Sequence, residues 1–432
     1  MYNSLEKESY AMYFIYNFLI ICLVCLLSPI ILIAMCIKPK FRAGFWQKIG
    51  FYTNIKKENQ KHIVVHAVSV GEVIAVEKFV KTLRETFKEE KIILTTVTKT
   101  GNAVANQKLK STVDEIIYFP FDLFFCVKSF IKNIKPDLVI IAETEIWPYF
   151  AKELNNKKIP IAIINGRISP NSHKGYKKFN WFFKKVLANY SKILMQTQGD
   201  RERIIDVGAP EQITEVMGNL KFDISNNFSK EEIANLKEQF ALNGNPLFIV
   251  GSTHNGEDEI VLAVYQAVSK IIPNLKMLLA PRHPERLKDV EALINSLDFK
   301  YGKRSNKDTF EENQIILLDT MGELSKLYAI SDIAFIGGSL SGTGGHNPLE
   351  AAIFDVPVLS GPSTFNFKDI YKYLTTDKAA FIVENQAQFE EMLEKLLTDK
   401  EFYTQASQAC NKVFKENSGA IKYAITIIKG LL

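Results

Sequence analysis

Short apolar runs alternate with longer stretches of helical length along most of this chain, from about residue 60 to the C-terminus. The runs are rich in Ile, Leu and Val, and turn residues or amphipathic segments separate them. Alternation of this kind is typical of parallel sheets that are covered by helices on both faces. It predicts an α/β fold with strands at 63–68, 92–97, 138–142, 161–164, 193–196, 247–250, 276–280, 315–318, 333–336, 356–359 and 380–383.

A polar segment at 223–246 interrupts the alternation and predicts an interdomain region. It contains Asp223, Ser225, Asn226 and Asn227, then a Lys/Glu-rich helix and a turn at 243–246. A chain of 432 residues is also too long for one ordinary core. We therefore expect two Rossmann-like domains, at 45–224 and 245–432, which face a central cleft between the carboxyl ends of their strands.

The N-terminal region contains a long apolar stretch, residues 11–37, without a charged side chain. Its length exceeds the ~20 residues that a helix needs to cross a bilayer. A cleaved signal peptide would have a basic leader and a shorter apolar core, whereas Glu6-Lys7-Glu8 precede this stretch. The stretch predicts an uncleaved, single-pass transmembrane anchor. The basic residues that follow it place the rest of the chain in the cytoplasm; they are Lys38, Lys40, Arg42 and Lys48.

Charge and cysteine content narrow the classes of function. The net charge of +5 is too small to indicate nucleic acid, but it suits anionic substrates or an anionic membrane surface. Three of the five cysteines lie in the apolar stretch, and Cys126 and Cys410 are isolated. This spacing predicts neither a disulfide framework nor a metal site, and the nucleophile elbow of hydrolases is absent.

A glycine-rich segment, residues 337–350, follows the expected strand at 333–336. Asn347 is a good helix N-cap, Pro348 suits the first helical position, and Glu350 stands where a capping box has its acid. Backbone N–H groups in such a loop can approach an anion closely, so the segment predicts a phosphate or nucleotide pocket. The spacing matches neither the dinucleotide fingerprint nor the P-loop. The alternative is a tight strand-to-helix turn.

Acidic side chains follow two expected strands of the first half. Glu72 comes after Ser69-Val70-Gly71, at the start of a helix, and could act as a general base. Alternatively, it is an acid favoured by the helix dipole. Glu143 and Glu145 follow the strand at 138–142 and point the same way if that strand continues. Their alternative role is to cap a neighbouring helix.

Basic groups are expected at the same edge of the first sheet. Arg167 follows the strand at 161–164, and Lys221 lies in the segment Gly218–Asp223 that closes this half. Between them, lysines alternate with aromatic residues from Lys174 to Lys185. That pattern fits a helix whose aromatic face joins the core, or a surface helix that rests on anionic lipid.

In the second half, several turns suited to anions follow consecutive strands. Gly251-Ser252-Thr253-His254 ends the first strand, and Arg282, after Pro281, can bind a phosphate with two parallel hydrogen bonds. A surface ion pair is the alternative for Arg282. Asp319-Thr320-Met321-Gly322-Glu323-Leu324 follows the third strand, and the glycine-rich segment follows the fourth. Together these turns predict a nucleotide site.

These motifs together resemble the 3-deoxy-D-manno-octulosonic acid (Kdo) transferases of Gram-negative lipopolysaccharide synthesis. The resemblance extends from the anchor almost to the C-terminus. Val68 and Thr98-Lys99 depart from the family pattern without affecting a candidate catalytic group. The motifs that carry the resemblance are Ser69–Glu72, Glu143-Thr144-Glu145-Ile146-Trp147-Pro148, Asn165-Gly166-Arg167, Gly218–Asp223, Pro281–Arg286, Asp319–Leu324 and Gly344–Glu350.

The resemblance implies a GT-B glycosyltransferase fold in the inner membrane, with CMP-Kdo as donor and a lipid A precursor, lipid IVA, as acceptor. It implies that Glu72 is the proton acceptor and that Glu143 and Lys221 stabilise the transition state. No metal or other cofactor is expected. The residues that it implies for CMP binding are Pro281, Arg282, Met321, Gly322, Glu323, Asn347, Pro348, Leu349 and Glu350.

The expected reaction is an inverting glycosyl transfer. Three alternatives remain open: a transferase that uses a UDP-sugar on a membrane lipid, a sugar-nucleotide epimerase, and a membrane-tethered nucleotide-binding module without catalysis.

Overall fold

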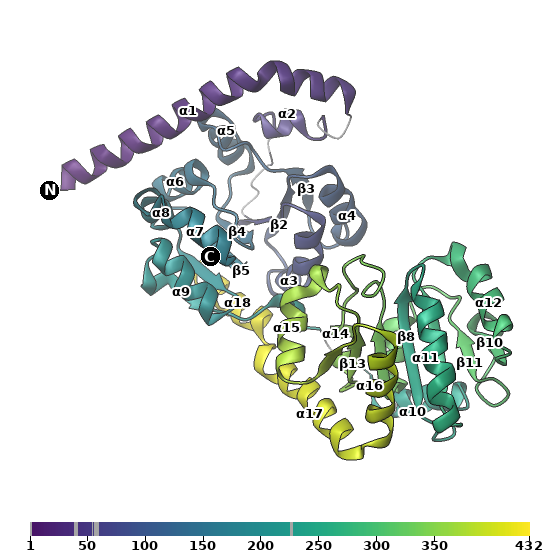
Figure 1. The fold of residues 1–432 in the computed structure, drawn as a ribbon. Coiled ribbons are helices and arrows are strands. Elements are labelled where there is room, and N and C mark those ends of the chain that lie inside the picture. The colour runs from purple at the N-terminus through teal and green to yellow at the C-terminus, as the bar shows by residue number, and fades with distance from the viewer. Residues whose placement is uncertain (1, 39–41, 54, 56–59, 225–227) are drawn as a thin grey trace. The chain divides into compact units, whose positions relative to one another are not determined.

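The computed structural model describes residues 2–38, 42–53, 55, 60–224 and 228–432. Lys40 and the polar residues Ser225, Asn226 and Asn227 lie outside these ranges. The chain divides into two compact units (Figure 1). The first combines Met1–Asp223 with Asn417–Leu432, and the second is Ile224–Glu416. Both are α/β units with one parallel sheet each, as the alternation of strands and helices predicts.

The first unit contains a seven-stranded sheet in the order β3-β2-β1-β4-β5-β6-β7. All neighbouring strands pair in parallel, which requires a crossover between successive strands. The expected strand at 138–142 has the predicted bounds. The strands are β1 (His62–His66), β2 (Lys91–Thr96), β3 (Glu115–Tyr118), β4 (Leu138–Ala142), β5 (Ile161–Gly166), β6 (Lys192–Met195) and β7 (Thr214–Val216).

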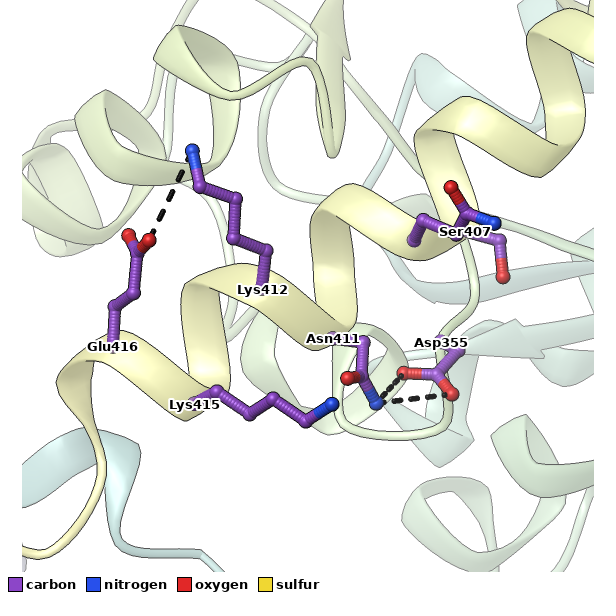
Figure 2. Close-up of a pocket in the computed structure, with 7 residues that line it drawn as sticks. Asp355, Ser407, Asn411, Lys412, Lys415 and Glu416 are labelled. Atoms are coloured by element: carbon purple, nitrogen blue, oxygen red, sulfur yellow. Dashed lines mark hydrogen bonds and ion pairs between the residues drawn. The ribbon is translucent and has the colours of Figure 1, made fainter.

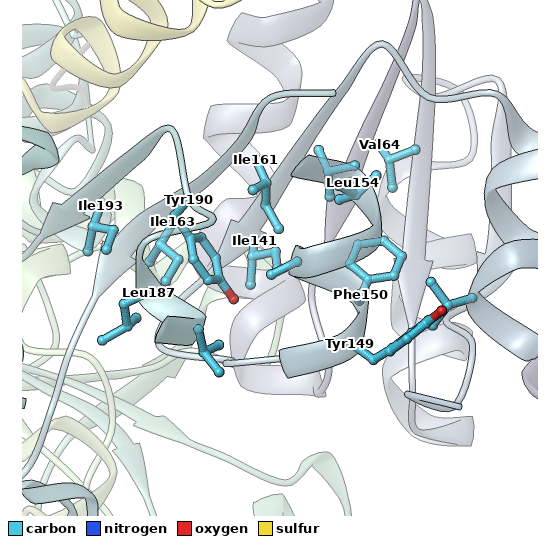
Figure 3. Packing of buried hydrophobic residues seen from close by; sticks show 14 of the residues in the cluster. Val64, Ile141, Tyr149, Phe150, Leu154, Ile161, Ile163, Leu187, Tyr190 and Ile193 are labelled. Carbon is cyan, nitrogen blue, oxygen red and sulfur yellow. The ribbon is translucent and has the colours of Figure 1, made fainter. Parts of the chain in front are cut away.

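Helices cover both faces of this sheet. Successive side chains of each strand point to opposite faces, so the strands contribute to two core clusters, one under each layer of helices. Val64 and Ile141 belong to the core cluster on one face, where Phe150 and Tyr190 pack (Figure 3). Ile63 and Val65 belong to the other cluster. The helices of the unit are α1 (Tyr2–Ile37), α2 (Phe45–Lys48), α3 (Val70–Thr86), α4 (Lys99–Leu109), α5 (Phe124–Ile134), α6 (Pro148–Asn156), α7 (Pro170–Lys177), α8 (Asn180–Leu187), α9 (Gln198–Val207) and α18 (Ala420–Lys429).

The C-terminal helix α18 belongs to the first unit, whereas the sequence analysis assigned all of 245–432 to the second domain. Ile421, Ala424, Ile425 and Ile428 are buried in the same cluster as α3. The carboxylate of Asp223 also accepts hydrogen bonds from the N–H groups of Gly419 and Ile421 at the start of α18. An apolar face and a capping acid therefore hold this helix on the first sheet.

The second unit also has a seven-stranded parallel sheet, in the order β10-β11-β9-β8-β12-β13-β14. Its core contains Tyr265, Phe335 and Phe389, and the last two rings stack with centroids 4.8 Å apart. The strands are β8 (Leu247–Thr253), β9 (Lys276–Pro281), β10 (Tyr301–Lys303), β11 (Ile315–Leu317), β12 (Ile333–Ile336), β13 (Val358–Ser360) and β14 (Ala380–Ile382).

The helices of the second unit cover its sheet in the same way. The polar segment that follows residue 228 forms α10, which begins with a capping box at Ser229 and Glu232. The helices are α10 (Lys230–Gln239), α11 (Glu257–Ile271), α12 (Leu287–Ser296), α13 (Leu324–Leu327), α14 (Leu349–Ala352), α15 (Lys368–Thr376), α16 (Gln386–Thr398) and α17 (Lys400–Asn417).

Helix α1 contains one segment, Ala11–Ile30, that is long and apolar enough to cross a membrane, with a mean hydropathy of 2.2. The segment lies near the N-terminus, as the sequence predicts, and few of its residues are buried. The chain therefore has one N-terminal helix that is consistent with a membrane anchor.

Candidate active site

The strand order gives each sheet one switch point, at which the direction of strand addition reverses. In the first sheet it lies between β1 and β4, and in the second between β8 and β12. Ligands of open parallel sheets bind outside the carboxyl ends of the strands at such points. Glu72 and Glu143 follow β1 and β4, while His254 and the glycine-rich segment follow β8 and β12. The predicted motifs therefore occupy both switch points.

Glu72 lies in the first turn of α3 and is 9% exposed. Its Oε2 accepts a hydrogen bond from the N–H of Val68 at 2.7 Å, and its Oε1 accepts one from Ser69 Oγ at 3.1 Å. Both donors belong to the turn between β1 and α3. The turn thus holds the carboxylate in one orientation at the carboxyl end of β1.

Burial raises the pKa of Glu72 to about 7. The negative charges of Glu143 and Glu145 raise it further, whereas the hydrogen bonds from Val68 and Ser69 oppose the shift. Burial and the Glu143 charge also raise the pKa of Glu145. The three acids therefore interact electrostatically, and Glu72 can exchange a proton near neutral pH, as a general base must.

The strand does not continue through Glu143 and Glu145, so the condition under which both acids would point the same way is not met. β4 ends at Ala142, and Glu143 has a left-handed backbone with φ 57°. The N–H of Glu143 still donates to the carbonyl of Ile164 on β5 at 2.9 Å. A sharp turn, and not strand periodicity, directs the two acids, and it leaves both side chains partly exposed.

Asn165 organises the neighbouring segments in the first unit. It is buried with φ 54°, and its Oδ1 accepts a hydrogen bond from the N–H of Leu220 at 3.1 Å. Lys221 follows in a 3-10 helix, Leu220–Phe222, where its N–H donates to Asn219 Oδ1 at 3.0 Å. Arg167 is placed by Thr144, whose Oγ1 accepts from the Arg167 N–H at 2.7 Å. The Asn-Gly-Arg and Asn-Leu-Lys motifs are thus linked through Asn165.

In the second unit, the glycine-rich segment binds an anion that belongs to the protein itself. The carboxylate of Glu257 is fully buried at the start of α11. Its two oxygens accept hydrogen bonds from the N–H groups of Gly338 (2.7 Å), Ser339 (2.9 Å), Leu340 (2.7 Å) and Ser341 (3.3 Å). The prediction that these amides are free to bind a phosphate is therefore corrected, because Glu257 already occupies them.

The helix after this segment begins one residue later than predicted. α14 covers Leu349–Ala352, and Pro348 precedes its first residue. Asn347 nevertheless acts as a cap, because its Oδ1 accepts the N–H of Leu349 at 3.2 Å. Burial raises the pKa of Glu350, while a side-chain hydrogen bond with Asn347 and the charge of Arg282 oppose the shift.

Arg282 is exposed just beyond the end of β9, and its N–H donates to the carbonyl of Thr253 at 3.0 Å. Two histidines lie close to it: His254 Nε2 is 2.9 Å from His346 Nε2, and their rings are stacked. Burial lowers the pKa of His346 to about 4, and the Arg282 charge lowers it further. This cluster presents a guanidinium to solvent beside Glu350 and His346.

Arg286, from the same motif, has a structural role. It forms an ion pair with the buried Asp258, and its Nη1 donates to the carbonyl of Thr253 at 2.9 Å. Glu323 is likewise paired, with Arg304 Nε at 3.0 Å, and Gly322 before it has φ 83°. Met321 is 76% exposed, so its apolar side chain is available to a ligand.

The Lys/aromatic segment forms two short helices, α7 and α8, and not one. Tyr176, Phe182 and Phe183 pack against the core, whereas Phe179 and Trp181 are 56% and 60% exposed. The core interpretation therefore holds for part of the segment. The other part is exposed, and its contact with anionic lipid stays a prediction.

Sequence reasoning missed Glu257 and the pairing of His254 with His346. Glu257 resembles any acid at the start of a helix, and nothing in its local sequence indicates a partner loop about eighty residues away. Among the described residues, no group of three His, Cys, Asp or Glu side chains could hold a metal ion.

A surface hollow on the second unit lies apart from these residues. It is lined by α17 residues such as Asn411, Lys412 and Lys415, and Asn411 Nδ2 donates to Asp355 Oδ1 at 3.2 Å (Figure 2). Asp355 precedes β13, so it lies toward the amino ends of the strands, opposite the switch point. The hollow is not part of the candidate site.

Comparison with known proteins agrees with the motifs. Residues 43–224 match a family model described as 3-deoxy-D-manno-octulosonic-acid transferase (kdotransferase). A UDP-GlcNAc 2-epimerase from Neisseria meningitidis, bound to UDP-GlcNAc, has a similar fold at 15% identity, with a TM-score of 0.56 over 85% of this chain and 100% of that one.

Two curated relatives carry the name 3-deoxy-D-manno-octulosonic acid transferase. The protein from Rickettsia bellii is 30% identical over 79% of this chain and 81% of its own length. The protein from Haemophilus influenzae is 36% identical over 91% of this chain and 92% of its own length. Because this identity extends over nearly the whole of both chains, the protein described here belongs to the 3-deoxy-D-manno-octulosonic acid transferase family.

Proposed function

We propose that the protein moves Kdo from CMP-Kdo to the lipid A precursor lipid IVA, with inversion at the anomeric carbon, in lipopolysaccharide core biosynthesis. Family membership supports Kdo as the sugar. The observation that carries the proposed chemistry is Glu72, whose pKa of about 7 at a switch point suits a general base.

The first unit supplies the base in this reaction. Glu72 accepts the proton of a glucosamine hydroxyl of the lipid, and the oxygen forms a bond to the anomeric carbon of Kdo. The bond from that carbon to the CMP phosphate oxygen breaks, and CMP leaves with the electron pair. Attack from the face opposite the leaving group inverts the configuration. Glu143 and Lys221 stabilise the charge that develops in the transition state.

The second unit holds the donor in this proposal. Arg282 binds the CMP phosphate, and Pro281, Met321, Gly322, Glu323 and the segment Asn347–Glu350 surround the nucleotide. Glu257 contributes indirectly, because it fixes the backbone of residues 338–341 next to that segment. Fixed cationic and N–H groups stabilise a departing phosphate without a metal, and we propose no cofactor.

We also propose that α1 holds the protein at the inner membrane with both units on the cytoplasmic side. The basic residues after α1, Lys38, Arg42 and Lys48, support this side. The exposed Trp181 and the lysines of α7 and α8 support contact with anionic lipid headgroups.

The donor site can be tested by calorimetry with CMP. We expect Arg282→Ala to weaken CMP binding roughly 10- to 100-fold, because a charge-assisted hydrogen bond is worth about 1.5–3 kcal/mol. Lys288→Ala is the matched control, since Lys288 is exposed nearby on α12. Unchanged CMP affinity in Arg282→Ala would remove this residue from the site, and tighter binding of UDP than of CMP would favour a UDP-sugar transferase or epimerase.

The pH dependence of kcat/KM tests the state of Glu72. The base must be unprotonated, so activity should rise with pH through about 7, the pKa of Glu72. Glu145→Gln removes a neighbouring negative charge and should move this rise to lower pH. A wild-type profile that rises near the ordinary carboxyl value of about 4.3 would contradict the assignment.

A further inference from the structure

The N-terminal part of α1 is packed into the first unit, although it belongs to the apolar stretch predicted to cross the membrane. Met12, Tyr13 and Asn17 are 8%, 2% and 8% exposed. The ring of Tyr16 packs against Phe182 of α8 with centroids 5.8 Å apart. One face of the helix in this region therefore has the burial of a core helix.

Three polar side chains on this face, those of Tyr13, Tyr16 and Asn17, have partners elsewhere in the unit. Tyr16 donates to Asp122 Oδ2 at 2.8 Å, and Asn17 Oδ1 accepts the N–H of Phe124 at 3.1 Å. Tyr13 accepts a hydrogen bond from Asn189 Nδ2 at 2.9 Å, and Lys152 Nζ lies 4.4 Å from the centre of its ring.

Asp122 connects this face of α1 to the start of α6. It is nearly fully buried, and its two oxygens also accept the N–H groups of Tyr149 (2.9 Å) and Phe150 (2.7 Å). The contact between α1 and the unit is thus specific and polar, and it does more than shield apolar surface.

The segment that follows α1 contacts both the end of the helix and the first unit. The guanidinium of Arg42 donates to the carbonyls of Met35 (2.6 Å) and Cys36 (2.9 Å) in the last turns of the helix. A few residues later, Gln47 Oε1 accepts the N–H of Tyr118 and the carbonyl of Lys48 accepts the N–H of Phe121, both at 2.8 Å.

The N-terminal part of α1 is therefore attached at 122–124 of the first unit, and α2, which follows α1 in the chain, is attached at 118–121. In Figure 1, α1 runs along this unit past α5 to α2.

This arrangement is incompatible with a crossing. From Asn17 to Ile37 the helix rises about 30 Å, which is the thickness of the hydrocarbon core. If Asn17 stayed docked and the helix crossed, Ile37 would leave the membrane on the far side. The short stretch between Ile37 and Gln47 would then have to cross the hydrocarbon core again, and it is too short to do so as a helix with its N–H and C=O groups satisfied.

We propose that α1 does not cross the bilayer but lies along one face of it, so that both ends of the helix and the first unit share the same side. The proposal rests on the proposed membrane location and refines it, since the sequence predicts a single pass. The outward face of α1 contacts the bilayer itself, with acyl chains around the helix and anionic headgroups beside it.

The surface around α1 suits this occupant. Trp181 and Lys185 line the groove beside Ile15 and Leu19 at one end, and exposed Trp46 follows the other end. Tryptophan prefers the headgroup level, and lysine attracts anionic lipid. In the middle, exposed side chains lie all round the helix, so lipid can surround it there. The exposed apolar residues of α1 are Phe14, Ile15, Phe18, Leu19, Leu23, Val24, Leu26, Leu27, Ile30, Ile33 and Ile37.

The topology can be measured in cells with reporters on the full chain. A fluorescent protein, which matures in the cytoplasm, and an alkaline phosphatase, which is active in the periplasm, are fused in turn before residue 1 and after residue 432. We expect both ends to give fluorescence and neither to give phosphatase activity, with the protein in the membrane fraction. An N-terminal phosphatase that is active while the C-terminus fluoresces would overturn the proposal.

A second measurement uses paired variants of the full chain in nanodiscs. Asn17→Leu removes the acceptor of the Phe124 N–H, so we expect the melting temperature of the protein to fall by about 2–4 °C. Ser28→Leu is the control, because Ser28 Oγ donates only within α1, to the carbonyl of Cys25. In a helix that crosses the bilayer, both substitutions replace a polar side chain by an apolar one in contact with lipid, so both should affect the melting temperature equally. Equal melting temperatures of the two variants would therefore overturn the docked arrangement. Neither measurement requires transfer activity, and loss of the proposed function would leave both results unchanged.

Discussion

Glu72→Gln is expected to lower kcat for Kdo transfer by about 10²- to 10⁴-fold, the usual contribution of a general base. Glutamine keeps the size of the side chain and can still accept the N–H of Val68, but it cannot take a proton from the acceptor hydroxyl. The substitution also removes a buried carboxylate beside Glu143 and Glu145, so folding should not suffer. Single-turnover transfer and CMP calorimetry measure the two consequences separately, and CMP affinity should be unchanged.

Glu77→Gln is the matched control for this variant. Glu77 lies on the same helix, α3, but forms ion pairs with Lys81 and Lys108 on the surface. Exposed pairs of this kind contribute little, so transfer should remain near the wild-type rate. If Glu72→Gln transferred Kdo as fast as Glu77→Gln does, Glu72 could not be the base.

Glu257→Ala is expected to lower the free energy of unfolding of the second unit by at least about 3 kcal/mol. Its buried carboxylate accepts N–H groups from the glycine-rich segment and from His254, at 2.8 Å for the latter. Each orphaned buried donor costs about 1–3 kcal/mol, although water in the new cavity recovers part of the loss. CMP binding should weaken as well, because residues 338–341 lose their fixed conformation.

Denaturant unfolding with a probe in the second unit measures this loss. Glu259→Ala is the control, since Glu259 is exposed in the same first turn of α11. The free energy of unfolding of Glu257→Gln should lie between those of the two alanine variants, because an amide retains one acceptor oxygen. Equal stability of Glu257→Ala and Glu259→Ala would show that the carboxylate does not hold the loop.

Strong periodic signals made most of the fold predictable. The central strands are buried on both faces and contain uninterrupted apolar runs, and β4 and β12 have the predicted bounds. The strands that were missed, β3, β7 and β10, are short and lie at or near the edges of the sheets, where exposed and polar side chains weaken the pattern. Helix α18 was assigned to the wrong unit because a sequence pattern shows that a face is apolar, but not which sheet it covers.

The candidate site was predictable as a set of motifs but not as a set of interactions. Within each unit the motifs follow parallel strands whose carboxyl ends share one edge of the sheet, so Glu72 in the first unit, and Arg282 and Asn347 in the second, could be placed from the order of elements alone. The ion pairs and hydrogen bonds of these side chains could not be predicted, because they depend on contacts between segments that are distant in the sequence. Glu257 shows this most clearly: the N–H groups of the glycine-rich loop bind a carboxylate of the same unit, and not the phosphate that the sequence predicts for them.

Mass spectrometry of the lipid product measures directly whether the protein transfers Kdo from CMP-Kdo to lipid IVA. Purified protein is incubated with lipid IVA and CMP-Kdo, in parallel with UDP-sugar donors and with the Glu72→Gln variant. We expect wild-type protein to add Kdo to lipid IVA from CMP-Kdo alone, and Glu72→Gln to give almost no product. Addition of a sugar from a UDP donor, or no addition from CMP-Kdo by folded wild-type protein, would contradict the proposed function.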